Sequence, residues 1–160
     1  MRQKLLSEFS ATLKKYFIID SFPLAVCKFG RAHYCRSFRT ENANYGVCPS
    51  KKEVYFGYKV HAIITLNGFI TKFEITPASI DDRQALLDMI DGESNIVILA
   101  DKGYVGVKLS ENLKKQGICL IALKRSNSKN NWSKSFRQLI FKFRRRIETN
   151  FSQLSRQLNT

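Results

Sequence analysis

The sequence predicts an α/β fold in which helices flank a mixed sheet of about five strands. Short runs of β-branched and aliphatic residues, such as residues 96–100, are typical of buried strands, and the segments between them have the apolar spacing of helices. The chain has 160 residues, of which 44% are hydrophobic, and no linker rich in Gly, Pro or Ser divides it. One core of ordinary size is therefore expected. We predict a helical extension over residues 1–15 and a single domain over residues 16–160.

Hairpin and helix signals give the order of the elements. Residues 54–66 and 69–76 are rich in strand-forming side chains and flank Asn67-Gly68, a dipeptide that favours a type I′ turn. Ser79 or Asp81 can cap the helix that follows. The predicted order is a helix over residues 3–14, strands over 16–20, 54–66 and 69–76, a helix over 83–90, a strand over 96–100, a helix over 107–116, a strand over 118–123 and a C-terminal helix.

The C-terminal helix has the clearest pattern. Its apolar residues recur at intervals of three and four, which places them on one face of a helix that can pack on the sheet. They are Phe136, Leu139, Ile140, Phe143, Ile147, Phe151, Leu154 and Leu158. Glu148 follows Ile147 by about 100° around the helix, so it lies at the edge of this apolar stripe.

This order of elements is that of a ribonuclease-H-like fold, with the five strands arranged 3-2-1-4-5. A right-handed crossover through the helix at residues 83–90 makes the fourth strand parallel to the first. Asp20 and Asp101, which end the first and fourth predicted strands, then meet at the carboxyl ends of neighbouring strands, where open α/β sheets bind ligands.

Asp20, Asp101 and Glu148 together suggest a metal site. Either aspartate alone is an ordinary turn residue, and Glu148 alone could simply pair with Arg144 one helical turn before it. Three carboxylates converging on one edge of a sheet instead suit divalent cations, which prefer oxygen ligands. Asp81 and Asp82 are interpreted as structural, because acids at a helix start favour the helix dipole and cap its amides.

The charge of the chain favours a polyanionic partner. Lys and Arg number 27 against 13 Asp and Glu, which gives a formal net charge of +14. No Asp or Glu occurs between Asn112 and Ile147, where the basic residues are Lys114, Lys115, Lys124, Arg125, Lys129, Lys134, Arg137, Lys142, Arg144, Arg145 and Arg146. A solvated surface normally mixes both signs, so this run predicts a basic face for nucleic acid, whose bound counterions are released on phosphate neutralisation.

Other classes of protein are disfavoured. No segment is long and apolar enough to span a membrane, and the N-terminus lacks the apolar core of a signal peptide, so a cytoplasmic protein is expected. The four cysteines form no CxxC pair, which predicts reduced thiols and no zinc site.

Five short blocks of the sequence stand out together. They are Ile18-Ile19-Asp20-Ser21, Gly57-Tyr58-Lys59-Val60-His61, Thr76-Pro77-Ala78-Ser79, Ala100-Asp101-Lys102-Gly103-Tyr104 and Arg144-Arg145-Arg146-Ile147-Glu148-Thr149-Asn150-Phe151-Ser152. These blocks resemble the catalytic domain of the DDE transposases of bacterial insertion sequences. They occur in the family's order, and their acids are spaced 81 (101 − 20) and 47 (148 − 101) residues apart. The resemblance covers nearly everything from Asp20 onward, and the short segment before Asp20 resembles a transposase truncated at its N-terminus.

The resemblance assigns roles to the matching residues. Asp20, Asp101 and Glu148 would be the catalytic triad and would bind two Mg²⁺ or Mn²⁺ ions, which activate a water or a 3′-hydroxyl and stabilise the leaving oxygen. Arg144 would pair with a phosphate. Lys59 and His61 alternate on one strand face that can point to DNA. The expected DNA-binding residues are Lys59, His61, Lys102, Lys124, Arg125, Arg144 and Arg145.

The expected function is metal-dependent cleavage of DNA strands and their transfer to a target during transposition of an insertion sequence. Two alternatives remain open, namely an inactive DNA-binding remnant of a transposase and a structure-specific nuclease of the same fold. Double-stranded transposon ends and target DNA are the implied partners. Transposases commonly act as dimers, which implies a homodimer, and action on a bacterial chromosome implies association with the nucleoid.

Overall fold

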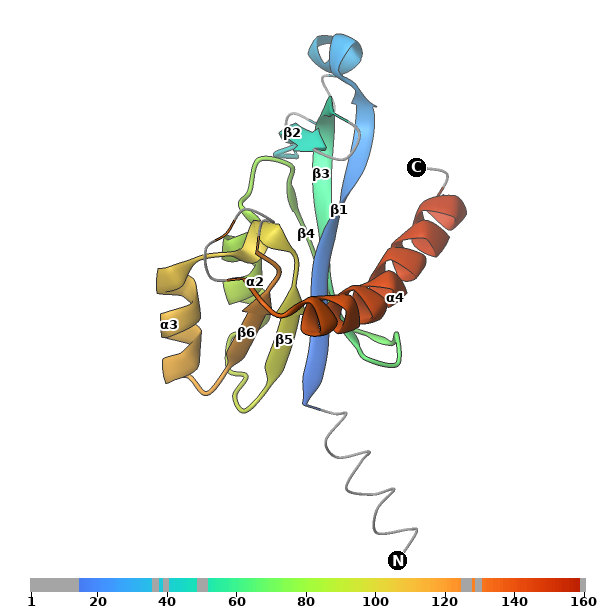
Figure 1. The fold of residues 1–160 in the computed structure, drawn as a ribbon. Coiled ribbons are helices and arrows are strands. Elements are labelled where there is room, and N and C mark those ends of the chain that lie inside the picture. The colour runs from blue at the N-terminus through green and yellow to red at the C-terminus, as the bar shows by residue number, and fades with distance from the viewer. Residues whose placement is uncertain are drawn as a thin grey trace, which may run out of the picture.

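A computed structural model describes residues 15–35, 38, 41–48, 52–124, 128 and 131–158. Its elements, shown in Figure 1, are β1 (Tyr16–Lys28), the 3-10 helix η1 (Phe29–Tyr34), β2 (Asn44–Cys48), β3 (Glu53–Thr65), β4 (Ile70–Pro77), α2 (Asp82–Met89), β5 (Val97–Ala100), the 3-10 helix η2 (Lys102–Tyr104), α3 (Val107–Lys115), β6 (Cys119–Ala122) and α4 (Lys134–Leu158). The predicted helix over residues 3–14 lies outside the described residues.

The six strands form one mixed sheet. Its order is β2-β3-β1-β5-β6, and β4 pairs with β3 along the same edge as β2. β3 is antiparallel to β1 and β4, whereas β5 is parallel to both β1 and β6. The five strands that the sequence predicted, β4, β3, β1, β5 and β6, therefore stand in the predicted order 3-2-1-4-5. The ribonuclease-H-like arrangement and the parallel fourth strand are confirmed.

The first strand is longer than predicted. It does not end at Asp20 but continues to Lys28, because residues 21–28 pair with β3 in the same antiparallel ladder. Pro23 is unusual inside a strand, since proline has no N–H to donate to a ladder. Among the described strands, β5 pairs with β1 only as far as Ile18, so Pro23 lies on a stretch with one open edge, where proline is tolerated.

A sixth strand, β2, was not predicted, because Asn44 and Gly46 are weak strand formers. Gly46 allows this strand to lie close against its neighbours. A Cβ at this position would come within 2.7 Å of the Ala78 Cβ and 2.8 Å of the Tyr55 ring, closer than packed carbon atoms approach. A larger residue at position 46 would force Ala78 or the Tyr55 ring to shift, which favours glycine here.

The hairpin between β3 and β4 was predicted correctly, but its turn type was wrong. A type I′ turn needs positive φ at both central residues, and of the pair only Gly68 has it, at +93°. The Gly68 N–H donates to the Thr65 carbonyl (2.9 Å), and the Thr65 N–H donates to the Phe69 carbonyl (2.9 Å). The connection is thus a longer loop that ends in a left-handed glycine.

Helices cover both faces of the sheet, with α2 and α3 on one side and α4 on the other (Figure 1). Successive side chains of a strand point to opposite faces of the sheet, so neighbouring residues pack against different helices. Ile19 packs with α2 and α3, in a core that includes Leu86 and Leu113, whereas its neighbour Ile18 packs with Ile147 of α4. The adjacent residues Ile18 and Ile19 therefore point to two different helical layers.

The described helices agree with their sequence signals. Asp81 is the N-cap of α2, because its carboxylate accepts a hydrogen bond from the Arg83 N–H (2.8 Å). Gly117 follows α3 with φ +77°, as expected of a glycine at a helix C-terminus. None of the helices among the described residues has the length and apolar character needed to cross a membrane.

Candidate active site

The register between β1 and β5 brings Asp20 and Asp101 together. Ile18 pairs with Leu99 at the end of the parallel ladder. Asp20 lies two residues after Ile18 and Asp101 two residues after Leu99, so both acids point to the same face as these residues, the face that α4 covers. Asp101 directly follows β5, whereas Asp20 lies inside β1 at the level where β5 ends.

Arg144 of α4 joins the two acids. Its Nη2 donates to Asp20 Oδ2 at 2.6 Å, and its Nη1 donates to Asp101 Oδ1 at 3.2 Å. Only 9% of the Arg144 side chain is exposed, against 15% for Asp20 and 35% for Asp101. Two carboxylates from neighbouring strands therefore face one largely buried cationic group.

Burial and charge act against each other in this cluster. Burial raises the pKa of Asp20, and the Arg144 guanidinium offsets only part of that effect. Burial alone would lower the pKa of Arg144, but the carboxylates of Asp20, Asp101 and Glu148 raise it above its ordinary value. The guanidinium is therefore charged and compensates the negative charge of the acids.

Glu148 lies one helical turn after Arg144, on the exposed side of α4. It is close enough to raise the pKa of Arg144, yet the structure joins only Asp20 and Asp101 through that arginine. In the part of the chain that is described, no three His, Cys, Asp or Glu side chains converge as ready metal ligands. The three predicted acids thus share a neighbourhood around Arg144, and two of them are in direct contact with it.

A comparison with families of known proteins bears on the chain as a whole. The profile of the family described as "Transposase DDE domain" matches residues 10–159. The chain belongs to this family. No curated protein matches the sequence.

The DDE domain is also similar to a solved structure, the piggyBac transposase in a cryo-EM structure of its synaptic complex with hairpin DNA. The similarity covers 72% of this chain and 24% of that chain, with a TM-score of 0.46 and 13% sequence identity. The domain therefore spans about a quarter of the length of that transposase. Phosphoryl transfer on DNA is the general activity of domains of this family.

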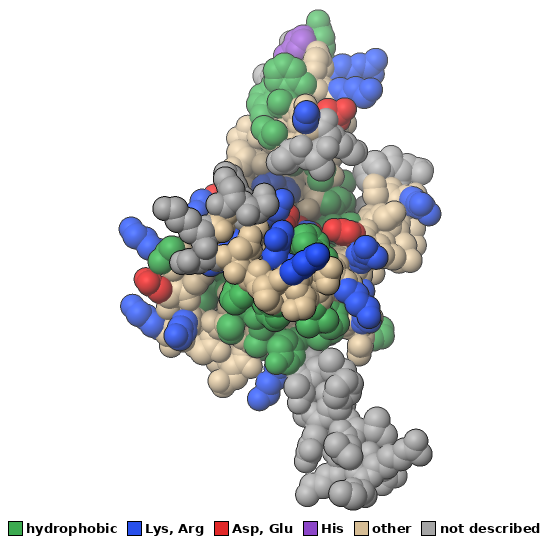
Figure 2. Space-filling model, in the orientation of Figure 1, with side chains coloured by type: hydrophobic (Ala, Val, Ile, Leu, Met, Phe, Trp, Pro, Cys, Tyr) green, Lys and Arg blue, Asp and Glu red, His purple; other side chains and the backbone are tan. Residues whose placement is uncertain are grey.

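Two of the predicted DNA-binding residues are exposed beside the acids. Lys102 follows Asp101, and Arg145 follows Arg144 on α4. Figure 2 shows Lys and Arg side chains spread over the face that carries α3 and α4, with fewer Asp and Glu among them. Lys124 places its Nζ 5.6 Å from the centre of the Trp132 ring. Arg125 lies outside the described residues.

The other predicted DNA contacts lie elsewhere. Lys59 and His61 do share one strand face, but that face is covered by α2. Lys59 Nζ donates to Asp82 Oδ1 at 2.8 Å, and His61 is fully buried, with Nε2 3.0 Å from Thr76 Oγ1. A contact between His61 and DNA would require this layer to open. Arg144, expected to bind phosphate, is instead occupied by the two aspartates.

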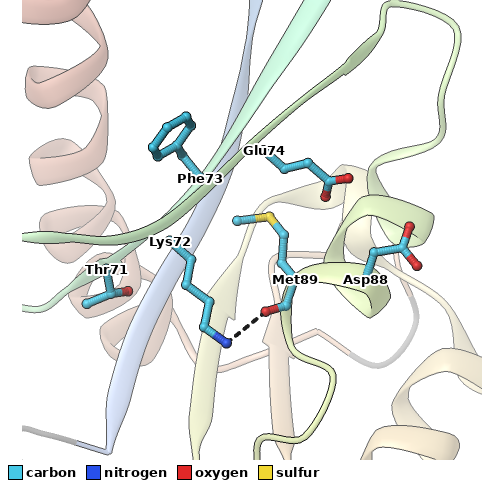
Figure 3. Close-up of a pocket in the computed structure, with 6 residues that line it drawn as sticks. All are labelled: Thr71, Lys72, Phe73, Glu74, Asp88 and Met89. Carbon is cyan, nitrogen blue, oxygen red and sulfur yellow. Dashed lines mark hydrogen bonds between the residues drawn. The ribbon is translucent and has the colours of Figure 1, made fainter.

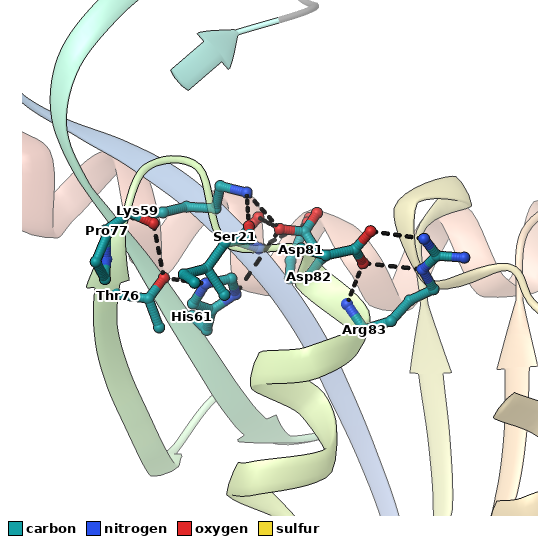
Figure 4. A network of polar contacts seen from close by, with 10 residues as sticks. Ser21, Lys59, His61, Thr76, Pro77, Asp81, Asp82 and Arg83 are labelled. Carbon is teal, nitrogen blue, oxygen red and sulfur yellow. Dashed lines mark hydrogen bonds and ion pairs between the residues drawn. The ribbon is translucent and has the colours of Figure 1, made fainter. Parts of the chain in front are cut away.

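Lys59, His61 and Thr76 belong to a polar network that the sequence did not predict (Figure 4). Asp82 lies at its centre and also accepts a hydrogen bond from Ser21 Oγ at 3.3 Å. Asp81, by contrast, points away and pairs with Arg83 at 2.6 Å. The two adjacent acids thus differ in role, because one caps the helix and the other reaches the strands.

His61 should make the stability of the DDE domain sensitive to acid. Burial lowers its pKa to about 4, the nearby Asp82 carboxylate offsets part of this effect, and Lys59 reinforces it. In the unfolded chain the pKa returns to about 6.5, so the unfolded state binds a proton first and the contribution of His61 to stability is lost as pH falls from about 6.5 to 4. The loss is expected to reach about 3 kcal/mol. Urea unfolding at pH 7, 5.5 and 4 measures it, and a His61→Gln variant with the same pH dependence would contradict it.

One surface hollow lies away from the candidate site. It lies between β4 and α2 and is lined by Thr71, Lys72, Phe73, Glu74, Asp88 and Met89 (Figure 3). Lys72 crosses it and donates to the Met89 carbonyl at 3.1 Å. None of these residues is one of the three candidate catalytic acids, the bridging Arg144 or a predicted DNA contact.

Proposed function

We propose that this DDE domain cleaves DNA strands and transfers the resulting 3′ ends to a target during transposition, using divalent metal ions. The observation that supports the proposal best is the pair of aspartates that face one cation across neighbouring strands. Arg144 lies within 2.6 Å of Asp20 and 3.2 Å of Asp101, so two hard oxygen ligands already converge on a point of positive charge. Family membership supports the same reaction class.

Mg²⁺ or Mn²⁺ fits the residues present. Asp20 and Asp101 would hold it, with Glu148 supplying a third carboxylate from α4. When bound, such ions lower the pKa of the attacking group and neutralise charge on the leaving oxygen, and two ions can divide these tasks. Arg144 now fills the space between the aspartates, so its guanidinium must move when a cation binds there.

The reaction can be written from the bonds that change. In cleavage, a water oxygen attacks phosphorus, the bond from phosphorus to the 3′ oxygen breaks, and the products are a 3′-hydroxyl and a 5′-phosphate. In transfer, that 3′-hydroxyl attacks a target phosphate and releases a new 3′-hydroxyl. Arg144, once displaced from the aspartates, is placed to pair with a phosphate oxygen, and the exposed Lys102 and Arg145 can hold the flanking backbone.

The expected substrate is double-stranded DNA from transposon ends and target. The net charge of +14 supports this choice, because binding to a polyanion releases counterions. Holding two DNA ends at once requires two sites, so we propose that the domain acts as a homodimer. Because its substrate would be chromosomal DNA, we expect the domain to associate with the bacterial nucleoid.

One observation favours an inactive DNA-binding protein as the second candidate. Arg144 satisfies both aspartates, and the described acids do not form a ready three-ligand group. A protein of this kind would bind DNA with strong salt dependence but would not cut it.

Incubation of supercoiled plasmid with the purified chain tests the proposal. We expect conversion to nicked and linear DNA with Mg²⁺ or Mn²⁺ and none with EDTA. Joining of a labelled 3′-hydroxyl oligonucleotide to the plasmid would distinguish a transposase from a nuclease that only cuts. If the chain binds the plasmid but leaves it intact both with Mg²⁺ or Mn²⁺ and with EDTA, that result would support the inactive protein instead.

A further inference from the structure

Asp82 contacts both segments that carry the candidate acids, although it lies on the opposite face of the sheet. Its Oδ1 accepts from the hydroxyl of Ser21, the residue after Asp20, at 3.3 Å. Its Oδ2 lies against Gly103, two residues after Asp101, so closely that a Cβ there would be 2.8 Å away. One carboxylate therefore touches the strand of the first acid and the turn that follows the second.

Lys59 fixes the Asp82 carboxylate in this place. Its Nζ donates to Asp82 Oδ1 at 2.8 Å and to the Ile80 carbonyl at 2.9 Å, and both side chains of the ion pair are mostly buried, with 18% and 23% exposed. His61 Nδ1 lies 3.9 Å from the same oxygen, and His61 pairs with Ser21 in the β1–β3 register. Figure 4 shows these side chains grouped around Asp82. The carboxylate is thus tied to β1 and β3 at once.

Tyr104, which follows Gly103, lies close to all three acids. Its buried hydroxyl has a pKa well above the ordinary value, first because of burial and then because of the negative charges of Asp82, Asp20 and Asp101. Capping of α2 does not explain the position of Asp82, because Asp81 performs that role. A helix-start acid that only favoured the dipole would gain nothing from reaching two strands and a turn.

We propose that Asp82 is a positioning residue that fixes Asp20 and Asp101 relative to one another by joining Ser21 and Gly103 from behind the sheet. It cannot contact the reacting phosphate from this side, because Ser21 and Asp20 point to opposite faces of β1. The inference rests on the proposed function, since the two aspartates would be the metal ligands. Partners that hold ligating carboxylates are typically worth about 10- to 100-fold in metal affinity.

The test compares Asp82→Ala with Asp81→Ala, its neighbour on the same helix. Both variants remove one acid from the start of α2, and Asp81→Ala also removes the helix cap, so it controls for the loss of charge and of helix capping. We expect Asp82→Ala to weaken Mn²⁺ binding, measured by calorimetry, at least about tenfold, while Asp81→Ala stays within about twofold. Equal affinities for the two variants would overturn the proposal.

Gly103→Ala probes the same contact from the other side. The added methyl should displace the Asp82 carboxylate, so Gly103→Ala is expected to weaken Mn²⁺ binding in the wild-type background and to change it little in the Asp82→Ala background. Additive effects of the two substitutions would contradict a shared contact. If Asp82→Ala fails to fold by circular dichroism, Asp82→Asn replaces it, because it keeps the shape and loses the charge that holds Lys59.

Hydrogen exchange without metal separates this proposal from the proposed function. In Asp82→Ala, amides in residues 97–106 should exchange faster than in wild type, whereas Asp81→Ala should affect only α2. If the wild type binds no Mn²⁺, the proposed function fails, and exchange alone decides the role of Asp82. Equal exchange of residues 97–106 in both variants would overturn the positioning role whatever the metal result.

Discussion

The Arg144→Met variant is expected to lose about 3 kcal/mol of unfolding free energy at pH 7 in EDTA, because breaking a buried ion pair leaves uncompensated charge. Arg144 is 9% exposed and binds both Asp20 and Asp101. Methionine keeps much of the apolar stem but removes the guanidinium. The two aspartates would then face each other without a counter-charge, and one of them would have to take up a proton or move towards solvent. Urea unfolding followed by circular dichroism measures the loss.

Arg145→Met is the matched control. It removes the same charge from the adjacent position of α4, but Arg145 is exposed. Substitutions at such surface positions usually change stability by less than about 0.5 kcal/mol. Millimolar Mn²⁺ should restore part of the stability of Arg144→Met, because a cation can replace the guanidinium between the carboxylates. Equal losses in the two variants would show that the bridge contributes nothing to folding.

Asp101→Asn is expected to reduce metal-dependent plasmid cleavage by more than about 100-fold, since even the groups that support a metal ligand are worth about 10- to 100-fold. The amide keeps the size of the side chain but loses the negative charge that a divalent cation needs. DNA affinity, measured by fluorescence anisotropy, should be unchanged or slightly tighter, because one negative charge is removed from a basic surface. The variant should therefore lose plasmid cleavage while it keeps its affinity for DNA.

Asp88→Asn provides the comparison for this variant. Asp88 is an exposed acid of α2 that accepts a hydrogen bond from Gln84, and it is not one of the proposed ligands. It should leave cleavage within about twofold of the wild type, because isolated surface groups contribute little. Cleavage by Asp101→Asn at the wild-type rate would mean that this acid is not needed for the chemistry.

The order of the strands and the proximity of Asp20 and Asp101 could be predicted from the sequence, because both follow from local patterns and one topological rule. Apolar runs marked the cores of β1 and β5, and the right-handed crossover made them parallel. The register then placed two acids, each two residues past a paired position, side by side. Where a pattern was weak, the prediction failed, as with β2 and the part of β1 after Asp20.

The contacts of the site could not be predicted, because they join residues that are far apart in the chain. Ser21 and Asp82 are separated by 61 residues, and Asp20 and Arg144 by 124. No local spacing signals that Arg144 reaches the aspartates rather than solvent. Similarly, the alternation of Lys59 and His61 showed which face they share, but not that α2 covers it.

Calorimetric titration of Mn²⁺ into the purified chain tests the central claim most directly, because it asks whether the carboxylates around Arg144 hold a metal ion. The titration should be run beside Asp20→Asn, with and without a short DNA duplex that can supply phosphate ligands. We predict that the wild type binds Mn²⁺ and that Asp20→Asn loses the binding while remaining folded. Equal binding by both proteins, or no binding by the folded wild type with DNA present, would contradict the assignment of these acids as a catalytic metal site.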